Sequence, residues 1–151
     1  MTDNQYMQLA LEEAKKALSE NEIPIGAVLV CQDTVITMGH NRREATFDPT
    51  SHAEIEVIRE ASQFLSRWRL TDCVLYVTIE PCPMCAGAMM NARIGKLVYG
   101  APNKLYGAID SKFHIGETGV ANHSLEIKSG VLASDCQALM DTFFSSHRDM
   151  D

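Results

Sequence analysis

Two short segments of this 151-residue chain carry side chains that could do metal chemistry. His52-Ala53-Glu54 offers an imidazole and a carboxylate, and Pro81-Cys82-Pro83-Met84-Cys85 offers two thiols. One nitrogen and two sulfurs suit zinc, and a catalytic zinc site uses three protein ligands and leaves its fourth position to water. We therefore expect the imidazole and both thiols to bind zinc, with Glu54 left over as an acid–base group.

The chemistry of such a site follows from its water ligand. Zinc lowers the pKa of that water toward neutrality and generates hydroxide beside a substrate. A carboxylate within hydrogen-bond reach can deliver a proton to a ring nitrogen and then to departing ammonia, and we assign this role to Glu54. The arrangement H-x-E…P-C-x-x-C is the known signature of zinc-dependent nucleobase deaminases, so the motif predicts a hydrolytic deaminase.

Other interpretations of these residues explain less. The C-x-x-C pair could be a redox pair, but His52 and Glu54 would then have no role. It could be half of a structural zinc site, but no other His or Cys has ligand-like spacing. Glu54 could be a capping carboxylate at a helix start. Structural or surface roles are expected for the remaining histidines and burial for the remaining cysteines: His40, His114, His123, His147, Cys31, Cys73 and Cys136.

Composition predicts one globular domain over residues 1–151. Hydrophobic residues make up 46% of the chain, and neither a linker nor an internal repeat is evident. The first twenty residues do not resemble a signal peptide, and no segment reaches the roughly 20 apolar residues of a membrane span. We therefore expect no membrane partner and a cytoplasmic protein whose five cysteines stay reduced.

Charge gives little support for a nucleic-acid partner. The net charge is −7, although residues 42–112 hold nine Lys or Arg against eight acids, so a local basic patch stays open. Trp68 lies between Arg67 and Arg69. It is either a stacking platform for bases or, as we favour, a partly buried packing residue.

Strand and helix patterns alternate along the chain, which predicts a three-layer α/β/α sandwich around a mixed sheet of about five strands. Ser51 with Glu54 three residues later predicts the N-cap of a helix that runs to about Phe64. A proline at Pro81 suits the first turn of another helix, which ends before Arg93. The other predicted elements are helices over 6–18 and 135–144 and strands over 23–31, 34–39, 73–79, 96–100 and 125–131.

Both halves of the zinc motif fall at predicted helix starts. Cys82 and Cys85, three residues apart, lie on one side of a first turn, where the helix dipole favours thiolates. If the two helices pack side by side on one sheet face, their N-termini converge and a tetrahedral site forms between them. Positions 52 and 54 ordinarily face apart on a helix, but first-turn side chains can all reach the space beyond its end.

Blocks well beyond the zinc motif resemble one family. They are IPIGAVLV at 23–30, NR at 41–42, DPTSHAEI at 48–55, LYVTIEPCPMCAGAM at 75–89, RI at 93–94, NH at 122–123, GVLA at 130–133 and FF at 143–144. In these blocks the chain resembles the bacterial tRNA-specific adenosine deaminases (the TadA family), which belong to the cytidine deaminase-like superfamily. The resemblance covers nearly the whole length.

The resemblance implies a homodimer, one zinc ion per subunit, and conversion of the wobble adenosine in a tRNA anticodon loop to inosine. It implies that Asn41 contacts the flipped-out nucleotide, and that Asn103, in a loop bordering the nucleic-acid groove, also binds substrate. The Met-rich helix from Cys82 is a candidate dimer interface. Deaminases of guanine, cytosine or cytidine share the zinc motif, so a free base or nucleoside is the alternative substrate. In the family's pattern, Glu54 shuttles protons and the zinc ligands are His52, Cys82 and Cys85.

Overall fold

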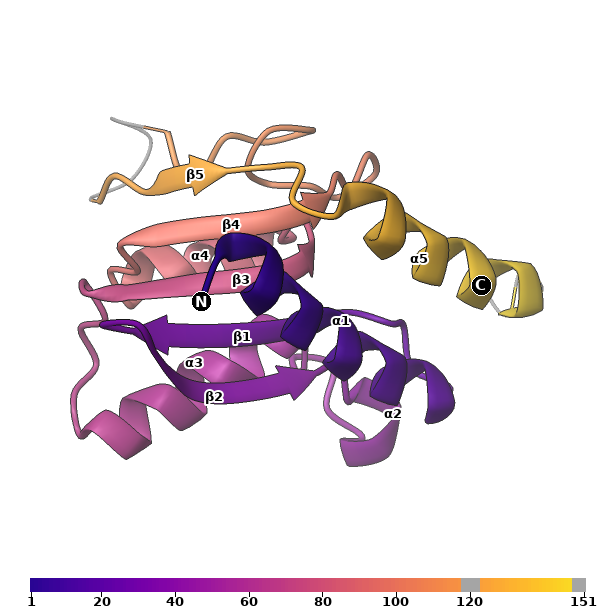
Figure 1. Ribbon diagram of the computed structural model, residues 1–151, viewed down its shortest axis with the longest axis horizontal. Helices are drawn as coiled ribbons and strands as arrows, with labels where there is room; N and C mark the ends of the chain where they lie inside the picture. The colour runs from indigo at the N-terminus through magenta and orange to yellow at the C-terminus, as the bar shows by residue number, and fades with distance from the viewer. Residues whose placement is uncertain (118–122, 148–151) are drawn as a thin grey trace.

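A five-stranded mixed sheet in the order β2-β1-β3-β4-β5 forms the centre of the computed structural model, which describes residues 1–117 and 123–147 (Figure 1). β1 pairs antiparallel with β2 and β3, while β3, β4 and β5 are parallel. The strands are β1 (Gly26–Cys31), β2 (Thr34–His40), β3 (Cys73–Ile79), β4 (Lys96–Ala101) and β5 (Glu126–Lys128). The helices are α1 (Asp3–Ser19), α2 (Arg43–Thr46), α3 (Ala53–Leu65), α4 (Pro83–Asn91) and α5 (Ala133–His147).

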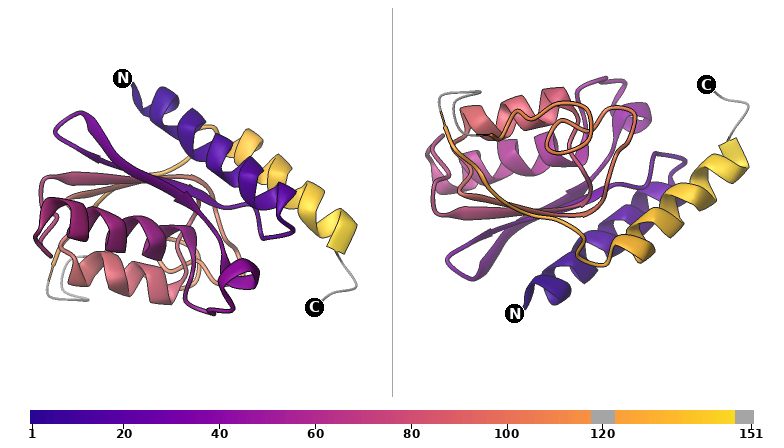
Figure 2. Two further views of the ribbon diagram at one scale, coloured as in Figure 1. Left: turned by 90° about the horizontal axis from the view of Figure 1, so that it is seen from below. Right: turned by 90° about the horizontal axis from the view of Figure 1, so that it is seen from above.

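Helices cover both faces of the sheet, as predicted: α1 and α5 lie on one face, and α3 and α4 on the other (Figure 2). Successive side chains of a strand point to opposite faces of the sheet, so each strand contributes to the hydrophobic cores on both faces. Val28 and Tyr76 pack under α1, whereas their neighbours Leu29 and Leu75 pack toward α3 and α4. The near-continuous apolar sequence of β3 follows from burial on both faces.

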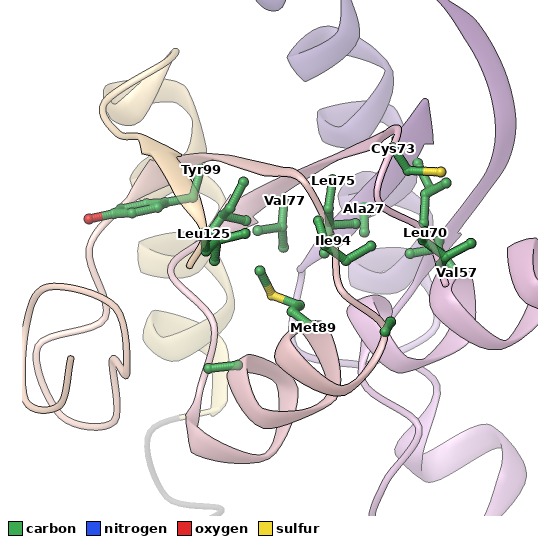
Figure 3. Close-up of a cluster of buried hydrophobic side chains, with 14 of the residues drawn as sticks. Ala27, Val57, Leu70, Cys73, Leu75, Val77, Met89, Ile94, Tyr99 and Leu125 are labelled. Carbon is green, nitrogen blue, oxygen red and sulfur yellow. The ribbon is translucent and has the colours of Figure 1, made fainter. Parts of the chain in front are cut away.

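The core beneath α3 and α4 fixes the positions of these two helices. Figure 3 shows Met89 of α4 pointing toward Val77 of the sheet, with Leu75 and Ile94 beside them. Val57 of α3 joins the same cluster, and all five side chains are completely buried. Small residues on the sheet-facing sides of both helices allow close approach; they are Ala53, Ala61 and Ala86.

Topology brings the starts of α3 and α4 to the same edge of the sheet. β2 and β3 both run antiparallel to β1 and therefore point in the same direction. α4 starts where β3 ends, and α3 starts shortly after the end of β2, after the short helix α2. The predicted convergence of two helix N-termini is confirmed.

Several predicted boundaries are wrong. β1 begins at Gly26 instead of Ile23, because the Ile25 N–H bonds back to the Ile23 carbonyl (2.8 Å) in a turn around Pro24. The last strand covers Glu126–Lys128 rather than 125–131. α2, a single turn without a buried residue, was not predicted. In α4 the first-turn proline is Pro83, so Pro81 lies before the helix. None of the described helices is both long and apolar enough to cross a membrane.

A test of this packing lies at Gly26, where β1 passes under α1. A Cβ at Gly26 would lie 2.0 Å from the Ala10 carbonyl oxygen and 2.6 Å from the Ala14 nitrogen. We expect Gly26→Ala to lower the free energy of unfolding by about 3 kcal/mol, because rigid backbone must move. Gly87→Ala is the matched control: a Cβ there meets nothing within 4 Å, and α4 should gain about 0.5–1 kcal/mol. Urea unfolding followed by circular dichroism measures both, and equal stabilities of the two variants would contradict this packing.

Candidate active site

Three possible metal-binding atoms meet between the starts of α3 and α4. His52 is the N-cap of α3 and Cys82 is the N-cap of α4, and neither caps its helix with its side chain. The His52 Nδ1 lies 3.6 Å from the Cys82 Sγ and 3.4 Å from the Cys85 Sγ. The prediction that Ser51 is the N-cap of α3 is wrong by one residue. The Ser51 hydroxyl instead accepts a hydrogen bond from Thr46 Oγ1 (3.1 Å).

The spacing of these three atoms fits a zinc ion. Zn–S bonds of about 2.3 Å and Zn–N bonds of about 2.0 Å place tetrahedral ligand atoms roughly 3.6 Å apart. The observed separations of 3.6 and 3.4 Å agree with that value. The residues that could hold a metal here are therefore those predicted, His52, Cys82 and Cys85.

The two thiols differ in acidity. A hydrogen bond from Cys85 lowers the pKa of Cys82 to about 4 despite its partial burial, and His52 adds to the effect. The same bond, together with burial, raises the pKa of Cys85. The hydrogen bond to Cys82 also raises the pKa of His52. Cys82 is thus a ready thiolate, and a metal ion bound to both sulfurs would displace the Cys85 proton.

Glu54 reaches the same space from the first turn of α3. It is the second residue after the N-cap, so it is not a capping-box residue. Its side chain is buried, and Oε1 has no hydrogen-bond partner in the part of the chain that the structure describes. Burial is the main cause that raises the pKa of Glu54 to about 7. A buried carboxyl group with one oxygen left for a substrate and a pKa near neutrality is suited to proton transfer.

A cavity of about 550 Å³ opens over this group, within the usual range for small-molecule sites. His52, Glu54 and Cys82 line it, so the spacing of residues 52 and 54 is no obstacle. The two predicted substrate-binding residues, Asn41 and Asn103, also line this cavity. Its apolar wall comes from segments distant in sequence: Ile23, Ile25, Leu105, Tyr106, Met140 and Phe144.

Sequence analysis did not single out two buried glutamates that support the cavity: Glu80 lines it, and Glu22 contacts the lining residue Asn41. Glu22 accepts hydrogen bonds from the Glu44 N–H (3.1 Å), the Ala45 N–H (2.8 Å) and Asn41 Nδ2 (3.3 Å). It therefore orients the Asn41 amide and holds the start of α2. Glu80 accepts several backbone N–H groups of the segment after β4. In both cases the sequence places a carboxylate directly beside an apolar run, and this placement could have indicated a buried, hydrogen-bonded glutamate.

Most of the other residues considered in the sequence analysis lie outside this cavity. Trp68 is 56% exposed, with the Arg69 guanidinium 4.7 Å from its ring centre, so the favoured partly buried packing role is wrong. Arg43 is the single Lys or Arg among the described residues that line the cavity. Cys31, Cys73 and Cys136 are buried, as predicted. His40, His114 and His123 bond to protein groups outside the site, whereas Asn122 and the His147 side chain fall outside the described residues.

Comparisons with known proteins agree with this geometry. The chain matches the MafB19-like deaminase family over residues 1–148. It is 45% identical over 144 residues to the tRNA-specific adenosine deaminase of Streptococcus pyogenes serotype M1, which covers 95% of this chain and 84% of that protein. The chain belongs to the tRNA-specific adenosine deaminase family.

Other tRNA-specific adenosine deaminases are equally similar. The Haemophilus influenzae protein is 45% identical over 148 residues, or 97% of this chain and 86% of its own length. A structure solved in work on A-to-I editing by tRNA:A34 deaminases at the wobble position superposes with a TM-score of 0.87. It is 42% identical and covers 89% of this chain and 98% of its own. The predicted family and the predicted deaminase fold are both confirmed.

Proposed function

We propose that this deaminase hydrolyses the wobble adenosine of a tRNA anticodon loop to inosine, with release of ammonia. The observation that carries the proposal is Glu54: it lines the same cavity as His52 and Cys82, and its buried Oε1 has no hydrogen-bond partner among the described residues. Leaving a carboxyl oxygen buried without a partner costs stability, and a catalytic role beside a donor set of this kind explains that cost. A substrate and its attacking water supply the missing hydrogen bonds.

Each residue of the donor set then has a role. His52, Cys82 and Cys85 would hold one zinc ion per subunit, which supplies a Lewis acid that activates water at neutral pH. Glu54 takes one proton from the attacking water and delivers it to the purine ring nitrogen. It then takes the second proton from the newly added hydroxyl group and delivers it to the amino group, which leaves as ammonia. A carboxyl group with a pKa raised to about 7 can both accept and donate this proton.

The cavity is suited to one extruded base. Asn41 and Asn103 would bind the nucleotide, and Glu22 fixes the Asn41 amide through its Nδ2 group. An anticodon-loop base is unpaired and is therefore cheaper to extrude than a base in a duplex. The exposed side chains of Leu105 and Tyr106 at the cavity wall offer apolar contact to the bound nucleoside.

The remaining features of the proposal concern assembly and location. We propose a homodimer that acts in the cytoplasm, where its tRNA substrate is found. The suggested Met-rich interface on α4 needs revision, because Met89 and Met90 are buried within the subunit's own core. Met84, 37% exposed, is the methionine of α4 that is available to a second subunit.

Loss of a ligand should remove the metal. We expect about one zinc ion per chain in the wild type, and less than about a tenth of that in Cys82→Ser and His52→Ala. Elemental analysis after dialysis measures the content. Cys136→Ser is the matched control, because this buried thiol belongs to α5 on the other face of the sheet and its loss should leave zinc unchanged. Full zinc content in Cys82→Ser would contradict the assignment.

Substrate identity is tested with transcribed tRNA that carries a wobble adenosine, and separately with free guanine, cytosine and adenosine. We expect inosine at the wobble position, detected by sequencing, and no ammonia from the free compounds. Glu54→Gln should keep its zinc and lose activity by about 10²–10⁴-fold, because the proton route is removed. Ammonia release from guanine or cytosine without inosine in the tRNA would instead favour a free-base deaminase.

A further inference from the structure

Glu80 connects the metal-binding segment to a distant loop. It directly follows β3, precedes Pro81-Cys82 and is 2% exposed. Its Oε2 accepts the backbone N–H groups of Ile109 (3.1 Å), Asp110 (2.8 Å) and Ser111 (3.0 Å). Its Oε1 accepts the Asn103 N–H (3.1 Å) and the Ser111 hydroxyl. One carboxylate therefore binds both ends of the segment 103–111.

This segment, the 103–111 loop, forms one wall of the catalytic cavity. Asn103, Leu105 and Tyr106 line the cavity together with Glu80 itself. Leu105 and Tyr106 are 73% and 65% exposed, so burial of their side chains contributes little to holding this part of the loop. The cavity-lining half is attached to Glu80 through the Asn103 N–H, and the other half through Ile109, Asp110 and Ser111. Ala108 and Ile109 are also buried in the core.

The loop passes Glu80 at van der Waals distance. A Cβ on Gly107 would lie 2.4 Å from the Glu80 Cδ and 2.4 Å from the Asn103 carbonyl oxygen. Gly107 also donates its N–H to that same carbonyl (2.8 Å), which closes a tight turn over the carboxylate. Position 107 requires glycine because a Cβ would collide with these atoms. Backbone conformation is not the reason, since Gly107 does not have a positive φ.

We infer that Glu80 is a positioning residue that sets the affinity for the substrate nucleotide by fixing the 103–111 loop. The reacting groups are on α3 and α4, which keep their own core contacts when the loop is released. Loss of the attachment should therefore weaken substrate binding and leave the chemical step nearly intact. The inference rests on the proposed function and adds to it a residue that need not touch the reacting atoms.

The test is steady-state kinetics of Glu80→Gln on tRNA that carries a wobble adenosine. The glutamine amide turns one acceptor into a donor that faces loop N–H groups, so we expect KM to rise about 10-fold while kcat stays within about 2-fold. Ser111→Ala removes one hydroxyl donor and should shift KM in the same direction by about 3-fold. Glu12→Gln, an exposed carboxylate paired with Lys15, is the matched control and should match the wild type.

Hydrogen–deuterium exchange supplies a readout that does not depend on activity. Exchange in Glu80→Gln should rise in the 103–111 loop and stay unchanged in β1 and β3 at full zinc content. An unchanged KM in a zinc-loaded variant, a lower kcat at unchanged KM, or faster exchange throughout the sheet with loss of zinc would each overturn the inference. If Glu80→Gln does not fold, Ser111→Ala decides between the same outcomes. If the wild-type protein is inactive on tRNA, the proposed function is contradicted. The exchange experiment then still tests whether Glu80 fixes the 103–111 loop.

Discussion

The contact between the N-termini of α3 and α4 is the interaction on which the rest of this protein's site depends. It brings His52 within 3.6 Å of the Cys82 sulfur although the two residues are 30 positions apart. Two features of the fold produce it: β2 and β3 run in the same direction, and small residues let both helices lie flat on one sheet face. The positive ends of two helix dipoles also favour thiolate ligands at this point.

Three buried glutamates, two lining the cavity and one behind it, show how the site is built. Glu22 and Glu80 accept backbone N–H groups of two segments that contribute to the cavity lining, and thereby hold those segments in place. Glu54 has one oxygen without a partner among the described residues. Two carboxylates thus shape the walls, and the third remains available for a proton. A buried acceptor without a partner lowers the stability of the fold. In the proposed function, this loss of stability is the consequence of keeping one Glu54 oxygen available for proton transfer.

The parts that sequence could predict are those that depend on short-range spacing. The order of elements and the sandwich follow from apolar periodicity, and the structure agrees with them. The predicted donors and Glu54 follow from local motifs, and the structure brings them together at one cavity. The roles of Glu22 and Glu80 depend on contacts with residues 19 to 31 positions away, which no local pattern encodes. The same reason applies to Met89 and Met90: the methionine content of their helix suggested an interface, but both side chains are buried in the core between this helix and the sheet.

We propose that one imidazole and two thiolates hold a zinc ion whose fourth position is open. X-ray absorption at the zinc edge of the wild-type protein tests this coordination most directly. We expect one nitrogen or oxygen set near 2.0 Å and two sulfurs at about 2.3 Å, in a four-coordinate site with a light-atom ligand that exchanges with added anions. A site closed by four protein ligands, or one without two sulfurs, would contradict it.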